Sequence, residues 1–220
     1  MEEIIEAGKI LAQIIRRLEK MVRPGITTKE LDKYARDFLI INQVKSAFLG
    51  YKKFPAVLCT SVNDKGIHGV PSNYVLKNGD IIDLDLGIKH KGYFADMSKT
   101  IPVGQVNQKA KHLIKTTKNA LIEGIAQAKP GNAIEDIGNA IENYVLKKGL
   151  KISRDFCGHG IGKKLHQLPN VRNYGTKGKG LKLKEGMVIC IEPLVIGDGL
   201  KAHFEHMVLI TKTGNKILTI

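Results

Sequence analysis

The chain has 220 residues, 43% hydrophobic and 25% charged, which is typical of a globular protein with a substantial core. No stretch approaches the roughly 18 uninterrupted apolar residues that a membrane span requires, and the acidic start Met1-Glu2-Glu3 is unlike a secretory signal. The three cysteines are odd in number, far apart and form no CxxC pair. This argues against a disulfide framework or a thiolate zinc site and favours the cytoplasm.

Basic residues exceed acidic ones and give a net charge of +14. Such an excess favours polyanionic neighbours, among them nucleic acid and the ribosome. The simpler interpretation is a lysine-rich solvated surface, because the lysines are spread along the chain and few aromatic residues accompany them.

Apolar residues recur at helical spacing in four segments, which predicts four amphipathic helices. These helices are expected over residues 4–22, about 27–41, 107–128 and 133–148. Pro24-Gly25 ends the first helix, Thr27 or Thr28 can cap the second, and Pro130-Gly131 separates the last two.

Strand-like runs fall between and after these helices. They cover residues 56–62, 79–88, 93–103, 187–196, 203–211 and 216–220. The order of helices, strands, helices and strands predicts one α/β domain with mostly antiparallel pairing and two similar halves. No linker or low-complexity tract divides residues 1–220.

The first predicted strand pair brings two aspartates together if its turn lies at His90-Lys91. Opposing residue numbers then sum to 181, which places Asp85 directly opposite Asp96. Directly opposed residues have Cβ atoms roughly 4.5–5.5 Å apart. Two carboxylates at that distance repel each other unless a cation lies between them.

The second strand pair repeats this arrangement. Asp198-Gly199 is a strong signal for a type I′ turn. A turn there makes opposing residue numbers sum to 397, so Glu192 lies opposite Glu205. A second acidic pair is therefore expected across a second hairpin.

Two acidic pairs fit a site for two divalent ions, because four carboxylates balance their charge. Oxygen-rich ligands with one or two imidazoles suit manganese, iron, cobalt or zinc. The alternative is that the acids are ordinary exposed strand residues. Asp83 shares a strand face with Asp85, so it could support the ligands or be a ligand itself, whereas Asp80 lies on the other face and is expected to be structural.

Three histidines lie in segments suited to function. His159 has glycines on both sides, which permit close backbone approach and unusual dihedral angles, and this favours a role as a metal ligand. His68 and His166 lie in loops rich in turn residues, where functional side chains concentrate. Each of these two, taken alone, could equally be structural.

The other histidines are distinguished by strand alternation and by their surroundings. His203 shares the strand face of Glu205 and is expected near the site, whereas His206 points the other way. His90 and His112 are expected to be exposed, and neither is assigned a role.

Several short motifs follow one another along nearly the whole chain. In chain order they are Ser61-Val62-Asn63 with His68-Gly69-Val70-Pro71, Asp83-Leu84-Asp85, Ala95-Asp96-Met97-Ser98, Gly158-His159-Gly160-Ile161-Gly162, Gly186-Met187 with Ile191-Glu192-Pro193, and Phe204-Glu205-His206. In this order and spacing the chain resembles the type I methionine aminopeptidases. The resemblance implies the pita-bread fold, in which two pseudo-symmetric halves contribute a curved, mostly antiparallel sheet covered by helices.

The resemblance also implies a metal site and an activity. It implies two divalent metal ions, with Asp96 and Glu205 bridging them. The implied ligands are Asp85, Asp96, His159, Glu192 and Glu205. The expected reaction is removal of the N-terminal methionine from new proteins with a small second residue, with Glu192 taking the proton of the attacking water.

The implied substrate contacts lie in two groups. The resemblance implies that His68 and His166 contact the substrate and stabilise the tetrahedral intermediate. It places Tyr51, Phe54 and Cys59 in the pocket for the methionine side chain. The expected partners are the N-termini of peptides and nascent chains, and the basic surface would allow contact with the ribosome. No membrane association is expected, and the enzyme is expected to be a monomer.

The chain departs from the family pattern around the methionine pocket. Leu165 replaces an aromatic residue, Phe48 stands where relatives often have a smaller one, the connection over 193–203 is short, and no tryptophan is present. Strict preference for methionine is therefore not implied. Two alternatives are an Xaa-Pro dipeptidase or aminopeptidase of the same fold, and a non-catalytic pita-bread protein that binds RNA or ribosomes.

Overall fold

The computed structural model describes all 220 residues and has four α-helices. They are α1 (Glu2–Glu19), α2 (Thr28–Ile41), α3 (Gln108–Gln127) and α4 (Ile134–Lys147). The four predicted helices are thus confirmed, with every end within three residues of its predicted position. None of them combines the length and the apolar character needed to cross a membrane.

Twelve strands make up the sheets. They are β1 (Lys45–Ser46), β2 (Leu58–Val62), β3 (Ile81–His90), β4 (Tyr93–Pro102), β5 (Lys151–Ile152), β6 (Cys157–Gly160), β7 (Gln167–Arg172), β8 (Val188–Ile191), β9 (Leu194–Gly197), β10 (Leu200–His203), β11 (His206–Ile210) and β12 (Asn215–Ile217). All their pairings are antiparallel.

Local signals explain where the helices begin. Thr27 caps α2, because its side chain accepts a hydrogen bond from the Glu30 amide while the Glu30 carboxylate accepts one from the Thr27 amide. Asn107 caps α3 by accepting from the Ala110 amide at 2.8 Å. Each helix then buries one apolar stripe against a sheet, which is where most helical stability arises.

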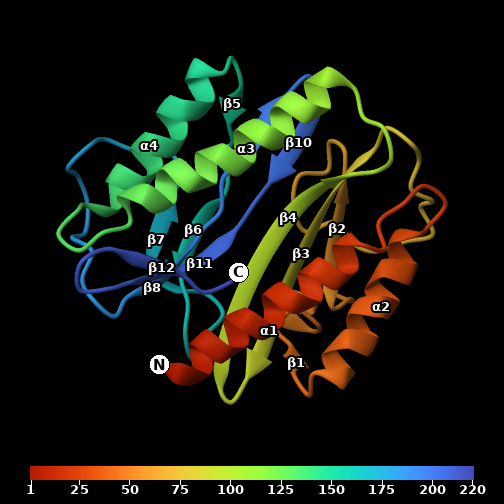
Figure 1. Ribbon diagram of the computed structural model, residues 1–220, viewed down its shortest axis with the longest axis horizontal. Helices are drawn as coiled ribbons and strands as arrows, with labels where there is room; N and C mark the ends of the chain where they lie inside the picture. The colour runs from red at the N-terminus through yellow and green to blue at the C-terminus, as the bar shows by residue number, and fades with distance from the viewer.

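Each half of the molecule combines two helices with antiparallel strands (Figure 1). In the first half, α1 and α2 pack on a sheet in which β3 pairs with β4 along one edge and with β1 and β2 along the other. In the second half, α3 and α4 cover the sheets β10-β9-β5 and β12-β11-β8-β6-β7. Two separate clusters of buried apolar residues form the cores. The predicted α/β architecture with two similar halves is confirmed.

The two halves are joined where β4 meets the residues that follow β10. Lys99 and Phe204 form an antiparallel bridge. The Glu205 amide donates to the Ser98 carbonyl oxygen at 3.0 Å. The Thr100 hydroxyl accepts from the His203 amide at 2.8 Å and donates to the His203 carbonyl oxygen at the same distance. This seam brings the acids of the first hairpin next to those of the second.

The predicted register of the first hairpin is wrong by two residues. Asp85 pairs with Ser98, and Asp96 pairs with Gly87. The turn lies at Lys91-Gly92 rather than at His90-Lys91. Both Lys91 and Gly92 have positive φ, of 46° and 87°, which a type I′ turn requires and which a glycine in the second position favours. Asp85 and Asp96 are therefore diagonal neighbours on one face of the sheet.

The predicted register of the second hairpin is confirmed. Leu200 pairs with Gly197 across Asp198-Gly199, and the same register continues at Ile191 and His206. Each predicted strand is nevertheless interrupted, at 192–193 and at 204–205, so that four shorter strands result. Pro193 contributes to the break because it has no amide to donate to the ladder.

The sequence pattern predicts no strands at β6 and β7, yet β6 lies inside the five-stranded sheet. Its glycines explain both facts. A Cβ atom on Gly158 would lie 2.2 Å from the Cys190 carbonyl oxygen, and one on Gly160 would lie 2.4 Å from that of Leu168. The neighbouring strands can approach only because side chains are absent there, and glycines carry no apolar periodicity.

Substitution of Gly87 by alanine is expected to destabilise the protein. A Cβ atom there would lie 2.5 Å from the Phe48 ring and 3.0 Å from the Ala47 methyl group. Overpacking of this kind costs about 1–3 kcal/mol, or roughly 2–4 °C in Tm per kcal/mol for a chain of this size. Thermal unfolding monitored by circular dichroism measures the effect. Gly214→Ala is the control, because its Cβ atom would meet open space; equal melting temperatures for the two variants would contradict the argument.

Candidate metal centre

A cavity of about 600 Å³ opens between the two halves, and both contribute to its wall. Four carboxylates and an imidazole lie at its base. The full lining consists of Phe48, Tyr51, Lys52, Lys53, Phe54, Pro55, Cys59, Ile67, His68, Val70, Asp85, Asp96, Asp155, Phe156, Cys157, His159, His166, Glu192, His203 and Glu205. All ten site residues predicted from the sequence are among them.

Three of the carboxylates form a tight, buried group. Asp85 comes from β3, Asp96 from β4, and Glu205 from the residue before β11. One oxygen of each lies within 4.8 Å of an oxygen of the other two. The residues are only 6%, 4% and 2% exposed, so the alternative that these acids are ordinary exposed strand positions is wrong.

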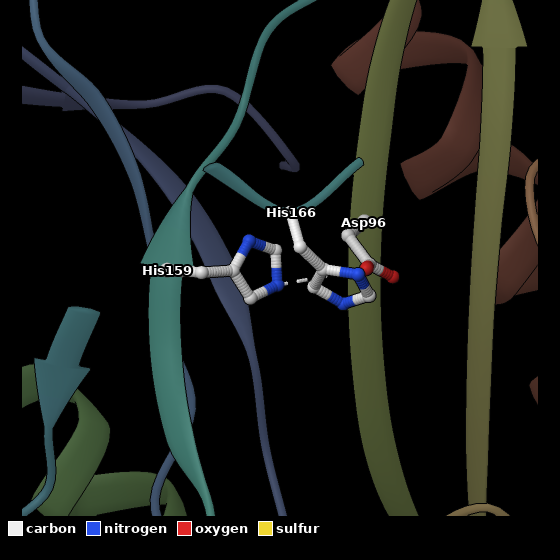
Figure 2. Close-up of side chains that lie close together, drawn as sticks. All are labelled: Asp96, His159 and His166. Atoms are coloured by element: carbon white, nitrogen blue, oxygen red, sulfur yellow. Dashed lines mark ion pairs between the residues drawn. The ribbon is translucent and has the colours of Figure 1, made fainter. Parts of the chain in front are cut away.

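His159 and Glu192 complete the cluster. The Nε2 atom of His159 lies 3.5 Å from Glu192 Oε1 and 3.9 Å from Asp96 Oδ2. Figure 2 shows His159 extending from β6 toward Asp96 on β4, with His166 beside them. The Nδ1 atom of His159 lies 3.0 Å from the Gly160 carbonyl oxygen, to which it can donate. That bond leaves Nε2 with its lone pair facing the acids, as metal ligation requires.

The electrostatics of this group fit a divalent cation. Burial, followed by repulsion from Asp96, raises the pKa of Asp85 and of Glu205 well above the usual range. Burial also raises the pKa of Asp96 to about 7. Asp85 Oδ1 and Glu205 Oε1 are buried without a hydrogen-bond partner. Oxygen donors without partners and carboxylates that repel one another both gain from a shared cation.

Asp83 and Asp80 do not reach the cavity. Asp83 lies behind it, 3.2 Å from the Ser98 hydroxyl and 3.3 Å from His203 Nδ1. Of the two roles that the sequence left open for Asp83, support for neighbouring groups fits this position. Asp80 accepts hydrogen bonds from the Asn63 side chain, the Tyr74 hydroxyl and the Lys77 amide, as expected for a structural residue.

His68 and His166 also line the cavity, and His166 lies within 4.8 Å of Asp96 and His159. The His166 ring is 4.3 Å from that of His159, and its Nδ1 is 2.8 Å from the Tyr51 hydroxyl. The His68 backbone is left-handed, with φ of 59°, and its ring meets that of Phe156 edge-on at 5.8 Å. Burial lowers the pKa of His68, and burial followed by repulsion from His159 lowers the pKa of His166 to about 4. The His166 imidazole is therefore neutral near pH 7.

The predicted pocket residues line one wall of the cavity. Tyr51 and Phe54 are partly exposed, whereas Cys59 is buried. Phe48 packs edge-on against Phe54, with ring centroids 6.5 Å apart. Phe156, which is 40% exposed, forms part of the wall and was not predicted. Its only signal in the sequence is its place directly before the Cys157-Gly158-His159 segment.

The remaining histidines follow the predictions with one exception. His203 is buried and approaches Glu192, and His206 points away and pairs with the Thr219 hydroxyl at 2.8 Å. His112 is exposed. The prediction of an exposed His90 is wrong, because its side chain packs near α1, 3.4 Å from Glu6 Oε2, and is only 13% exposed.

Comparison with known proteins places the chain in a family. Residues 2–212 match metallopeptidase family M24, and the chain belongs to this family. A methionine aminopeptidase of Clostridium perfringens is 42% identical over 98% of this chain and 94% of its own length. The crystal structure of methionine aminopeptidase from Rickettsia prowazekii superposes with a TM-score of 0.96 at 37% identity, over 99% of this chain and 95% of that one.

A more distant relative shares the fold. The prolidase from Pyrococcus furiosus superposes with a TM-score of 0.85 at 25% identity, but this chain covers only 63% of it. Within family M24 the chain therefore groups with the methionine aminopeptidases, which are metallo-aminopeptidases of the pita-bread fold.

Proposed function

We propose that this protein removes the N-terminal methionine from peptides and nascent proteins whose second residue is small, and that residues 1–220 form one catalytic domain for this reaction. The observation that carries the proposal is the buried cluster of four carboxylates and one imidazole at the base of an open cavity. The relatives named methionine aminopeptidase, similar over nearly their whole length, support it.

Two divalent metal ions are proposed as the cofactor, with cobalt, manganese, iron or zinc suited to the donor set. The proposed ligands are Asp85, Asp96, His159, Glu192 and Glu205. Asp96 and Glu205 would be the central ligands, because each lies within 4.8 Å of Asp85, of the other and of His159. When bound, such ions acidify water and polarise the substrate carbonyl.

The chain's own residues account for the proton transfers. Glu192 is the least buried of the four acids, with a side chain 11% exposed, and it faces the cavity. It accepts the proton of the attacking water and passes it to the leaving amine. Neutral His68 and His166 donate N–H bonds to the oxygen on which charge develops, where such bonds are worth most in the transition state.

The first side chain of the substrate is assigned to the wall formed by Tyr51, Phe54 and Cys59, with Phe48 edge-on against Phe54. These residues offer an apolar slot in which each methylene contributes roughly 1–3 kcal/mol to discrimination. The preference for methionine over leucine or norleucine is thus expected to be modest.

Three further features belong to this proposal. The enzyme acts in the cytoplasm, because nascent N-termini emerge there. It acts as a monomer. Ribosome contact through the basic surface is supported by Lys52 and Lys53 at the cavity wall and by exposed Lys163 and Lys164, none of which makes an ion pair. Such charges speed the association of a protein with a polyanion, and the association rate falls as salt is added.

The deciding experiment incubates the purified protein, loaded in turn with manganese, iron, cobalt or zinc, with the peptides Met-Ala-Ser and Met-Gly-Met. Release of free methionine, quantified by mass spectrometry, supports the proposal. No turnover with any of the four metals contradicts it and favours the non-catalytic alternative. Fastest cleavage of peptides with proline second would instead favour an Xaa-Pro peptidase.

Substitution of Tyr51 by phenylalanine is expected to lower kcat. For His166 Nε2 to donate to the substrate, its Nδ1 must accept the Tyr51 hydroxyl proton, and the 2.8 Å contact between them favours this tautomer. Loss of one such bond costs about 1 kcal/mol, or roughly fivefold in kcat. Steady-state kinetics with Met-Ala-Ser measures the change. Tyr144→Phe is the control, because that hydroxyl binds Asn119 between α3 and α4; equal kcat values in the two variants would remove the assigned role.

A further inference from the structure

His203 occupies a position between two carboxylates. It is the last residue of β10 and is only 2% exposed. Its Nδ1 atom lies 2.7 Å from the Ser98 hydroxyl and 3.3 Å from Asp83 Oδ2, and its Nε2 atom lies 3.6 Å from Glu192 Oε2. Asp83, His203 and Glu192 thus form a line that runs from the interior into the cavity.

The inner end of this line is rigid. Asp83 is 1% exposed and does not line the cavity. The Ser98 hydroxyl lies 3.2 Å from its Oδ1 atom as well as beside the imidazole. The backbone of His203 is held on both sides by Thr100 at 2.8 Å. The imidazole therefore has a fixed place and a fixed ring orientation.

The outer end of the line lacks a partner of its own. His203 Nε2 is buried without a hydrogen bond, and the nearest polar group is Glu192 Oε2. A carboxylate only accepts hydrogen bonds, so this contact is attractive when Nε2 carries a proton. The 3.6 Å separation is just beyond hydrogen-bond length, and a small rotation of the Glu192 side chain closes it. The other oxygen of Glu192 faces His159 at 3.5 Å.

We propose that His203 is a positioning residue whose ring nitrogens both carry a proton: its Nδ1–H group is held by Asp83 and Ser98, and its Nε2–H group donates to Glu192 Oε2 and fixes the rotation of that carboxylate. With one oxygen anchored, the other stays directed toward His159 and the acids of the cluster. The effect on catalysis rests on the function proposed above. The effect on the geometry of Glu192 is independent of that function, because it can be measured through metal binding alone.

The test compares His203→Leu, which removes the donor, with His203→Gln, which keeps an N–H donor on a side chain of similar reach. Four quantities are measured for each: kcat and KM with Met-Ala-Ser, the dissociation constant for Mn²⁺ by calorimetry, and the melting temperature without metal. His206→Gln is the matched control, since it alters a partly buried histidine on the next strand along the chain, β11, that points away from the cavity.

We expect His203→Leu to lower kcat and to weaken Mn²⁺ binding, each by about 10- to 100-fold, as is usual when a group that orients a metal ligand is lost. KM should change by less than about threefold. His203→Gln should recover most of both losses, and the control should match the wild type. Asp83→Asn should reproduce part of the His203→Leu loss, because it weakens the support of the ring.

Two results would overturn the proposal. One is a His203→Leu variant whose kcat and Mn²⁺ affinity stay within twofold of wild type. The other is a His203→Gln variant as impaired as His203→Leu, which would indicate a packing role without a hydrogen bond. If the wild-type protein releases no methionine, the proposed function fails, and the Mn²⁺ comparison still decides the role of His203.

Discussion

Substitution of Glu192 by glutamine is expected to reduce kcat for Met-Ala-Ser by about 10²- to 10⁴-fold, the usual contribution of a general base. Glutamine has the same shape but cannot accept the proton of the attacking water. Its neutral oxygen is also a weaker partner for a divalent ion, so Mn²⁺ affinity should fall as well. Steady-state kinetics at saturating Mn²⁺ separates the loss of the base from the loss of metal.

The matched control for this substitution is Glu185→Gln, which makes the same chemical change at an exposed glutamate that forms no ion pair. Both variants should melt within a degree or two of the wild type when metal is absent, because Glu192 lies at the cavity rather than in either core. Activity of Glu192→Gln close to that of the control would show that another group takes the proton.

Removal of metal is expected to abolish activity and to lower the melting temperature, by much more at pH 8 than at pH 5.5. In the metal-free protein, burial raises the pKa of Asp96 to about 7 and the pKa of Asp85 and Glu205 above the usual range. In the unfolded chain these groups titrate near pH 4. Between pH 4 and about pH 7 the folded protein therefore binds more protons than the unfolded chain.

The sign of the pH dependence follows from this difference. Where the folded state holds more protons, a rise in pH favours unfolding, so the metal-free protein loses stability as the pH rises from about 4 through 7. Bound cations stabilise the ionised carboxylates and displace those protons, so metal affinity rises over the same range. The stabilisation by metal is consequently small in acid and large at pH 8.

Differential scanning calorimetry with EDTA and with excess Mn²⁺ measures this difference. At a free metal concentration 100 times the dissociation constant, binding contributes about 2.7 kcal/mol, which corresponds to roughly 5–10 °C in Tm. The difference between the two conditions cancels the general effect of pH on a chain of net charge +14. A metal-induced shift that is equal at both pH values would contradict ligation by these three carboxylates.

The sequence was sufficient to predict that the four acids lie close together, because successive side chains of a β-strand alternate between its two faces. The error of two residues in the register of the first hairpin leaves Asp85 and Asp96 on the same face, since the side-chain period of a strand is two. An error of one residue would have turned one of them away. The second hairpin was predicted correctly because Asp198-Gly199 leaves little freedom in the placement of its turn.

What the sequence could not provide are contacts between segments far apart in the chain. The seam between β4 and residues 203–205, the bond between Tyr51 and His166, and the place of Phe156 in the wall each join residues about 100 positions apart or belong to loops. No local period encodes such contacts. The same holds for β6. Its neighbouring strands approach so closely that only glycine fits, and the sequence does not reveal which strands those are.

The candidate ligands are divided between the halves, with Asp85 and Asp96 on one side of the seam and His159, Glu192 and Glu205 on the other. An ion bound by both groups acts as a removable cross-link in a chain whose three cysteines are all free. Unlike a disulfide, such an ion leaves when the chain unfolds, so it stabilises the folded state by mass action, by about 4.1 kcal/mol at a free metal concentration 1,000 times the dissociation constant. With the proposed ions bound, metal supply would set how firmly the two halves hold together, and with it how readily a protease could enter between them.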